Sequence, residues 1–228
     1  MALVKRQAAV ETEENVFWTT MSDLMLGLAI IFITLFVLAM TGFTQQAMQQ
    51  QKVKMDVAKE LEEGLKKANV EANIDRMTGD LEIPAAALFD VNSYVLTPAG
   101  KQLLSKLAPI YVNTLFANKN LSDQIESILV QGHTDSQMFV GVTSVNEQFI
   151  RNMDLSLKRA NSVAEFILQT GYDKKNEAAF RKMIVVEGRS SNDPIIINGK
   201  EDYDKSRRVE LKLKVKDWSV ASAFSLGK

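Results

Sequence analysis

The sequence has no cysteine and only one histidine, His133, among its 228 residues. Disulfides, thiolate nucleophiles, cysteine-based zinc or iron–sulfur sites and multi-histidine metal centres are therefore excluded. The G-x-S-x-G, H-E-x-x-H and G-x-x-x-x-G-K-[ST] motifs of hydrolases and nucleotide-binding proteins are also missing from the sequence. The formal net charge of −1 argues against a nucleic-acid binder that works by bulk charge. We therefore expect a protein that is not an enzyme and that uses no metal or cofactor.

The apolar residues are unevenly distributed, although the mean hydropathy of −0.07 resembles that of an ordinary soluble protein. No charged residue interrupts the run from Leu24 to Phe43. A helix of this length spans about 30 Å, the thickness of the hydrocarbon core of a bilayer. The apolar part of a cleavable signal peptide is shorter and lies nearer the N-terminus. We expect residues 17–43 to form one uncleaved transmembrane helix, in which Phe17 and Trp18 lie at an interface.

Positively charged residues predict how this helix is oriented. Lys5 and Arg6 precede the helix, and the next cation after it is Lys52. Cytoplasmic segments carry the excess of lysine and arginine in membrane proteins. We therefore expect residues 1–16 to form a cytoplasmic tail and residues 44–228 to lie across the membrane.

Asp23 stands at the start of the apolar run and has two interpretations. In the first, Ser22 or Asp23 caps a helix at the membrane interface, where an acid suits the positive end of the helix dipole. In the second, Asp23 lies below the headgroups, about one turn beyond Phe17 and Trp18, and carries ions across the membrane. The position of Asp23 alone leaves both alternatives open.

The string FWTTMSDLMLGLAIIFITLFVL, residues 17–38, resembles the transmembrane segment of the B subunits of ion-driven rotary motors. This family includes the flagellar stator B subunits and the B subunit of the Zorya anti-phage system. The shared pattern is an aromatic pair, a few small or hydroxyl residues, an Asp-Leu-Met sequence and an aliphatic helix rich in phenylalanine. The resemblance implies that Asp23 is the ion-translocating residue and that Thr20 and Ser22 lie near the ion path.

The same resemblance implies partners for the chain. In this family the acid moves ions through a complex of five multi-span A subunits around two B helices, so a second copy of this chain is expected as well. Protons are the expected ion, and sodium is the alternative. The Zorya system is favoured over the flagellar stator because the Met-Thr-x-Leu pattern expected after the acid in stators is missing and the chain is comparatively short.

Residues 44–71 form a predicted helical linker after the apolar run. Val57, Leu61, Leu65 and Ala68 recur at intervals that place them on one stripe of a helix. Three interpretations are open: a coiled linker between two copies, a plug that seals the ion path, or a solvated tether.

From residue 72 onward, short predicted strands alternate with predicted helices. Thr97-Pro98 marks a helix start, because threonine caps helices and proline is favoured in the first turn. The pattern predicts an α+β fold, a sandwich in which helices cover one face of a sheet. Strands are expected at 79–84, 125–130, 183–186 and 209–215, and a second helix at 155–170.

Five strings in this region resemble the OmpA-like peptidoglycan-binding domain, and they occur in the order of that family. They are Leu88-Phe-Asp, Leu96-Thr-Pro-Ala-Gly, Gly132-His-Thr-Asp, Asn152-Met-Asp-Leu-Ser-Leu-Lys-Arg-Ala and Ser206-Arg-Arg-Val-Glu. The resemblance implies an OmpA-like domain over residues 72–216, followed by a tail at 217–228. It also implies a chain anchored in the bacterial inner membrane, with its C-terminal domain in the periplasm.

The ligand implied by this resemblance is the diaminopimelate side chain of a peptidoglycan stem peptide, which carries an ammonium and a carboxylate. A fixed carboxylate beside a fixed guanidinium matches such a zwitterion. Transfer from the family assigns the ammonium to Asp135 and the carboxylate to Arg159. Four further residues are expected to shape the pocket: Thr134, Asn152, Leu155 and Arg208. Without the resemblance, the favoured interpretation is that Asp135 and Arg159 pair with each other.

One feature near this site departs from the pattern of the OmpA-like family, and another could suggest a different function. Residues 136–151 are longer and more apolar than the usual loop of the family, so they could cover the pocket, form a dimer contact or alter the ligand. His133 invites a hydrolase interpretation, but the sequence supplies no further residues for one, and it is expected to fill the edge of the site.

The predicted function is that of the B subunit of a proton-driven rotary motor that is anchored to peptidoglycan and serves in anti-phage defence. The alternatives are a flagellar stator B subunit and a passive tether between the membrane and the cell wall, which needs no ion path.

Overall fold

The structure of the protein, a computed structural model, describes residues 2–68, 70 and 72–216, with side chains from Val16 onward. It divides into two compact units, the first extending to Gln49 and the second beginning at Gln50. The expected C-terminal tail at 217–228 lies outside the described residues.

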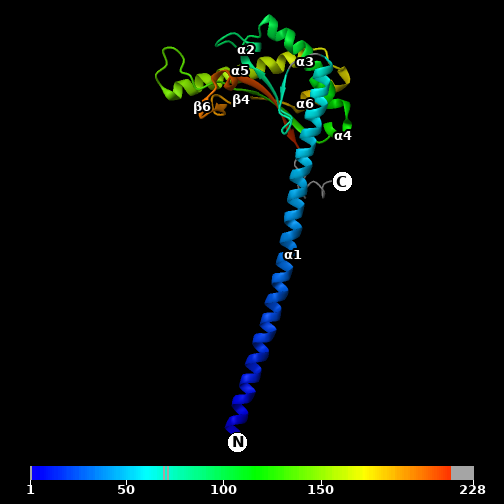
Figure 1. The fold of residues 1–228 in the computed structure, drawn as a ribbon, viewed down its shortest axis with the longest axis vertical. Helices are drawn as coiled ribbons and strands as arrows, with labels where there is room; N and C mark the ends of the chain where they lie inside the picture. The colour runs from blue at the N-terminus through cyan, green and yellow to red at the C-terminus, as the bar shows by residue number, and fades with distance from the viewer. Residues whose placement is uncertain (1, 69, 71, 217–228) are drawn as a thin grey trace. The chain divides into compact units, whose positions relative to one another are not determined.

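The first unit consists of the helix α1 (Ala2–Lys67) as far as Gln49. Figure 1 shows α1 as one continuous helix. From Val16 onward it contains a window with a mean hydropathy of 2.7, which makes it a candidate membrane span. The predicted apolar helix is therefore confirmed, and α1 extends beyond the expected 17–43 at both ends.

The second unit is built on a mixed five-stranded sheet. The strands are antiparallel except for the parallel pair β3–β4. Alternate residues of β7 from Val209 to Val215 are buried in the core, as the alternating sequence predicts. In spatial order the strands are β1 (Asn73–Ile74), β2 (Leu81–Pro84), β7 (Arg208–Val215), β3 (Ile125–Gly132) and β4 (Ile184–Gly188).

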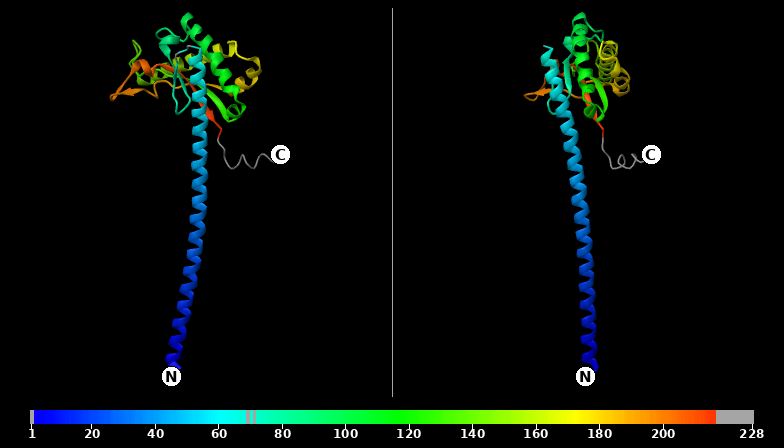
Figure 2. Two further views of the ribbon diagram at one scale, coloured as in Figure 1. Left: turned by 45° about the vertical axis from the view of Figure 1, so that its right-hand side comes forward. Right: turned by 90° about the vertical axis from the view of Figure 1, so that its right-hand side faces the viewer.

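Two long helices provide the second layer of this unit. The helix α5 (Val145–Gln169) packs against β3 and β4, and α3 (Pro98–Ala117) packs against α5 (Figure 2). The predicted α/β sandwich is confirmed. The shorter elements are α2 (Ala85–Leu88), α4 (Lys119–Ser122), the 3-10 helix η1 (Lys174–Asn176), α6 (Glu177–Met183), α7 (Tyr203–Ser206) and a hairpin of β5 (Ile196–Ile197) and β6 (Lys200–Glu201).

The helix starts follow from local capping chemistry. The Thr97 hydroxyl accepts a hydrogen bond from the Gly100 amide at 3.0 Å, and Pro98 occupies the first turn of α3. The second predicted helix was placed at 155–170, but α5 begins ten residues earlier, where Ser144 caps it by accepting from the Glu147 amide. Part of the apolar insertion at 136–151 is therefore helical.

The last turns of α1 belong to the second unit. Val57, Leu61 and Leu65 of the predicted stripe are buried in the core together with Val53, whereas Ala68 is exposed. Gly64 lies close to α3, because a Cβ added there would be 3.1 Å from the Ile110 side chain. The structure therefore uses most of this stripe as a wall of the core of the second unit.

Candidate ligand-binding pocket

The end of β3 and one face of α5 meet at a pocket of about 520 Å³. They approach closely because Gly132 ends β3: a Cβ added at this position would be 2.0 Å from the Ser156 carbonyl oxygen. Thr134 and Asp135 follow β3 directly, while the predicted residues on α5 recur at spacings that share one helix face. The pocket is lined by five of the six predicted binding residues, Thr134, Asp135, Asn152, Leu155 and Arg159.

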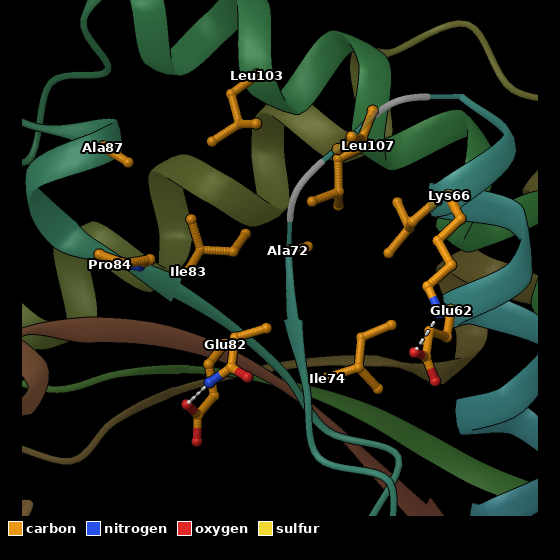
Figure 3. A pocket seen from close by; sticks show the side chains of 13 residues that line it. Glu62, Lys66, Ala72, Ile74, Glu82, Ile83, Pro84, Ala87, Leu103 and Leu107 are labelled. Atoms are coloured by element: carbon orange, nitrogen blue, oxygen red, sulfur yellow. Dashed lines mark hydrogen bonds and ion pairs between the residues drawn. The ribbon is translucent and has the colours of Figure 1, made fainter.

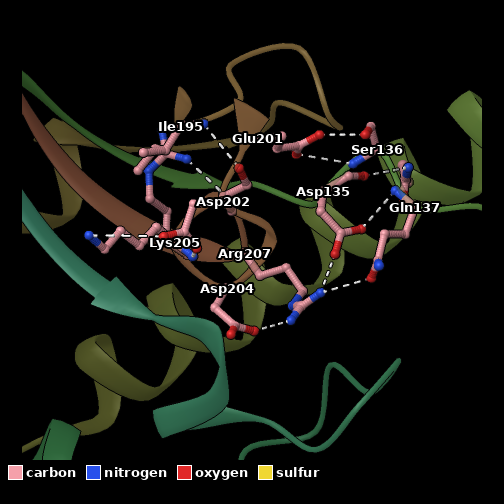
Figure 4. Close-up of polar contacts among 12 residues, drawn as sticks. Asp135, Ser136, Gln137, Ile195, Glu201, Asp202, Asp204, Lys205 and Arg207 are labelled. Carbon is pink, nitrogen blue, oxygen red and sulfur yellow. Dashed lines mark hydrogen bonds and ion pairs between the residues drawn. The ribbon is translucent and has the colours of Figure 1, made fainter. Parts of the chain in front are cut away.

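Asp135 is buried, and both of its carboxylate oxygens are engaged. Oδ1 accepts a hydrogen bond from the Gln137 amide at 3.2 Å, and Oδ2 pairs with the guanidinium of Arg207 (Figure 4). The Asp135 carbonyl oxygen accepts a hydrogen bond from Asn152 Nδ2 at 3.2 Å, which ties the residue to α5. Two neighbours thus hold the carboxylate at the wall of the pocket, and a third holds the backbone of the same residue.

Arg159 lies in the same pocket without a carboxylate partner. Only 4% of the residue is exposed, its Nε donates to the Ser93 carbonyl oxygen at 2.8 Å, and its Cζ lies 5.4 Å from the centre of the Phe89 ring. Burial lowers the pKa of the Arg159 guanidinium, the positive charge of Arg207 lowers it further, and the charge of Asp135 opposes both effects. Within the described part of the chain, no ion pair joins Arg159 to Asp135 or to another acid. The alternative in which the two predicted residues pair with each other is therefore not what the structure adopts.

Arg208 lies elsewhere. Its Nε pairs with the carboxylate of buried Glu210, and its Nη1 donates to the Ser206 carbonyl oxygen at 3.1 Å, so its donors face away from the residues that line the pocket. The preceding residue, Arg207, lines the pocket instead. Arg207 directly precedes β7 and Arg208 is the first residue of that strand, and of the two only Arg207 is among the residues that line this pocket.

Two buried side chains beside the pocket, Thr134 and His133, have polar atoms without a hydrogen-bond partner among the described residues. The Thr134 hydroxyl lines the pocket and is unpartnered, so it remains available to a ligand. His133 is fully buried but does not line the pocket: its Nε2 lies 3.4 Å from Glu210 and its Nδ1 3.9 Å from Asp193. Although burial raises the pKa of Glu210, the nearby His133, the ion pair with Lys212 and the charge of Arg208 hold this pKa below its usual value.

The part of the insertion before α5, residues 136–144, contributes to the wall of the pocket. Ser136 donates from its amide to Glu201 at 3.2 Å, and Gln148 accepts from the Phe139 amide at 2.8 Å. Met138, Phe139 and Val140 line the pocket, and Met138 and Val140 are exposed. The structure thus places this part of the insertion in the wall of the pocket.

The predicted ion-path residues lie in the first unit. Asp23 is exposed and lies within α1, far from its first residue, so neither Ser22 nor Asp23 caps the helix. The Thr20 and Ser22 hydroxyls donate to the carbonyl oxygens of Val16 and Trp18, at 2.7 and 2.8 Å. These hydroxyls are satisfied within the helix, and the Asp23 side chain projects outward.

A second pocket, of about 600 Å³, lies between the end of α1 and the edge of the sheet (Figure 3). Its walls are largely apolar, with Leu103, Leu107 and Ile83 turned into it. At its rim, hydrogen bonds from Arg76 and Lys66 lower the pKa of the Glu62 carboxyl to about 2. This pocket contains none of the predicted binding residues.

Comparison with known proteins places these features in context. The Zorya protein ZorB of Escherichia coli (Crooks strain) is 27% identical over 226 residues, covering 92% of this chain and 93% of that protein. ZorB of Escherichia coli O139:H28 is 25% identical over 223 residues, covering 92% of this chain and 84% of that protein. A MotB-like protein from Desulfovibrio vulgaris shares the fold with a TM-score of 0.51 at 20% identity, covering 74% of this chain and 98% of that one.

The sequence profile of the OmpA family matches residues 88–208, from the end of α2 to the start of β7. This match includes the whole set of residues predicted for the ligand site and covers more than half of the 228 residues. The chain is thus similar to ZorB over nearly its whole length, shares its fold with a MotB-like protein, and belongs to the OmpA family.

Proposed function

We propose that the chain is the membrane-anchored B subunit of a proton-driven rotary complex in Zorya-type anti-phage defence, held to peptidoglycan by its second unit. The observation that carries this proposal is the combination, in one chain, of a membrane-length apolar helix bearing a single acid and a pocket with a separately held acid and arginine. The similarity to ZorB over 92% of the chain supports the same assignment. In this role the chain makes and breaks no covalent bond.

The pocket is suited to the zwitterionic end of diaminopimelate. The held carboxylate of Asp135 receives the ligand ammonium, and the buried guanidinium of Arg159, which pairs with no acid among the described residues, receives the ligand carboxylate. The free hydroxyl of Thr134 supplies a further hydrogen bond, while Asn152 and Leu155 complete the wall. A buried cation without an acid gains more from an arriving carboxylate than an exposed one, because water competes less.

The acid of the membrane helix is suited to ion transfer. Asp23 is the only charged residue between Glu14 and Lys52, and an isolated carboxylate at membrane depth is costly unless partners or ions compensate it. We assign the N-terminus to the cytoplasm and the second unit to the periplasm, with the helix in the inner membrane. The expected partners are five copies of a multi-span A subunit and a second copy of this chain, with protons as the ion and sodium as the alternative.

The test of the ion-carrying role is Asp23→Asn, assayed by phage plaquing in cells that express the complete defence system. The amide has nearly the shape of the carboxylate but carries no charge, so protection should fall to the level of cells without the system. Thr34→Val is the matched control, because the Thr34 hydroxyl donates only to the Ile30 carbonyl oxygen of its own helix. Full protection by Asp23→Asn at normal membrane levels would refute the motor role and leave the passive tether.

Two further measurements separate the remaining alternatives. Asp135→Ala should weaken binding of the full chain to isolated sacculi while its membrane level stays unchanged; unaltered sacculus binding would defeat the assignment of the site. A swimming assay in cells that lack their stator B subunit tests the flagellar alternative, and restored swimming would overturn the assignment to defence.

A further inference from the structure

The pocket contains two arginines and only one buried acid. Arg207 pairs with Asp135, whereas Arg159 pairs with no acid in the described part of the chain. Asp135 and Arg159 nevertheless line the same pocket, and the charge of Asp135 opposes the lowering of the Arg159 pKa by burial. Asp135 and Arg159 are thus oppositely charged groups in one pocket that do not pair with each other, while the Asp135 carboxylate pairs with Arg207.

Arg207 is fixed at both ends of its guanidinium and through its backbone. Its Nη1 contacts Asp135 and lies 3.3 Å from Gln137 Oε1, and its Nη2 pairs with Asp204 (Figure 4). Its carbonyl oxygen accepts from the Ala85 amide at 2.9 Å, at the join between β2 and α2. Because the guanidinium is planar and rigid, these contacts define where the Asp135 carboxylate lies.

Without Arg207, the buried carboxylate of Asp135 and the buried guanidinium of Arg159 would be each other's natural partners, because buried charges are stable when they are paired. That pair would consume the two groups that a zwitterionic ligand needs. We propose that Arg207 is a positioning residue, which holds Asp135 and thereby leaves Arg159 open to the carboxylate of the ligand. A carboxylate has about four lone-pair sites, so Asp135 can accept the ligand ammonium while Arg207 still holds it.

This inference rests on the proposed peptidoglycan binding and makes a statement about specificity. Diaminopimelate carries a carboxylate beside its terminal ammonium, whereas lysine, at the same place in a stem peptide, carries the ammonium alone. The ratio of the affinities for the two stem peptides therefore measures whether Arg159 is open to the side-chain carboxylate of diaminopimelate. When Arg207 is lost, Asp135 turns to Arg159 and the discrimination falls.

The experiment is calorimetric titration of the purified full chain in detergent with two soluble stem tripeptides, one ending in meso-diaminopimelate and one ending in L-lysine. The unaltered chain should bind the diaminopimelate peptide at least about tenfold more tightly, as expected for one charge-assisted contact. Arg207→Ala should bind it about tenfold more weakly and prefer it by no more than about twofold. Arg207→Lys should retain most of the preference, because its ammonium can still hold Asp135 as a point charge.

Arg181→Ala is the matched control, since Arg181 forms an exposed ion pair with Glu177 outside the pocket and should bind like the unaltered chain. If Arg207→Ala does not fold, as judged by its melting temperature, Arg207→Gln removes the charge while keeping hydrogen-bonding groups and should lose the same preference. An Arg207 variant that is folded and keeps the full preference would overturn this inference alone. An unaltered chain that binds neither peptide would overturn the wall-binding proposal and this inference together.

Discussion

Leu61→Ala offers a sharp test of where the second unit begins. Leu61 lies on α1 in the segment expected to be a linker, yet it has 0% exposure and belongs to the hydrophobic core of the second unit. Truncating a fully buried leucine to alanine removes apolar contacts and leaves a cavity, which costs about 2–5 kcal/mol. For a unit of this size, that loss lowers the melting temperature by roughly 5–15 °C. A solvated tether or a plug held elsewhere would lose almost nothing from the same change.

The assay is differential scanning calorimetry of the full chain in detergent, following the transition of the second unit. Met55→Ala is the matched control, because Met55 lies on the same helix and is 44% exposed, so its removal should change the free energy of unfolding by no more than about 0.5 kcal/mol. Equal melting temperatures for Leu61→Ala and Met55→Ala would show that the end of α1 does not contribute to the core, and the reasoning would be wrong.

Two further predictions concern the sheet end that carries the pocket. Gly132→Ala should destabilise the second unit by about 1–3 kcal/mol and weaken sacculus binding, because the added Cβ would lie 2.0 Å from the Ser156 carbonyl oxygen and push α5 away from β3. Gly171→Ala is the control, because a Cβ added there meets no described atom within 4 Å. Equal melting temperatures for the two variants would contradict this prediction. Because the pKa of Glu210 is depressed in the folded chain, the unfolded chain binds a proton at this position more readily than the folded chain does. The ionised Glu210 carboxylate therefore stabilises the fold above the pKa of the unfolded chain, about 4.3. This stabilisation is lost as the pH falls toward the pKa of the folded chain. Glu210→Gln should therefore flatten the loss of stability below about pH 4.5 in acid denaturation profiles, and parallel profiles would refute the assignment.

Much of the fold was predictable because its signals are local. The alternation along 209–215 and the Thr97-Pro98 start each depend on a few neighbouring residues, and both appear as expected in β7 and α3. The early start of α5 also had a local signal, Ser144 followed three residues later by Glu147, which is the pattern of a capping box. The apolar residues just before it favoured a loop insertion and concealed that signal.

Other features could not be predicted because they depend on tertiary partners. The stripe on the end of α1 was visible in the sequence, but periodicity does not say which surface covers it, and α3 with the rest of the core does so here. The choice between Arg207 and Arg208 depends on which side of the sheet each faces at the start of β7. Family motifs identified the pair of arginines, and only the three-dimensional arrangement separates their roles.

The first unit alone offers few polar groups around Asp23. The side chains of residues 16–45 are exposed, Asp23 among them, and the hydroxyls of Thr20 and Ser22 are already satisfied within α1. An ion path needs polar groups on more than one side of the ion, because an ion that enters the hydrocarbon must exchange its water for other ligands. One helix supplies Asp23 and little else, so the proposed ion path requires further walls from other chains. The proposed A subunits and second copy meet that requirement, and purification of the complex from membranes with identification of its subunits tests it directly.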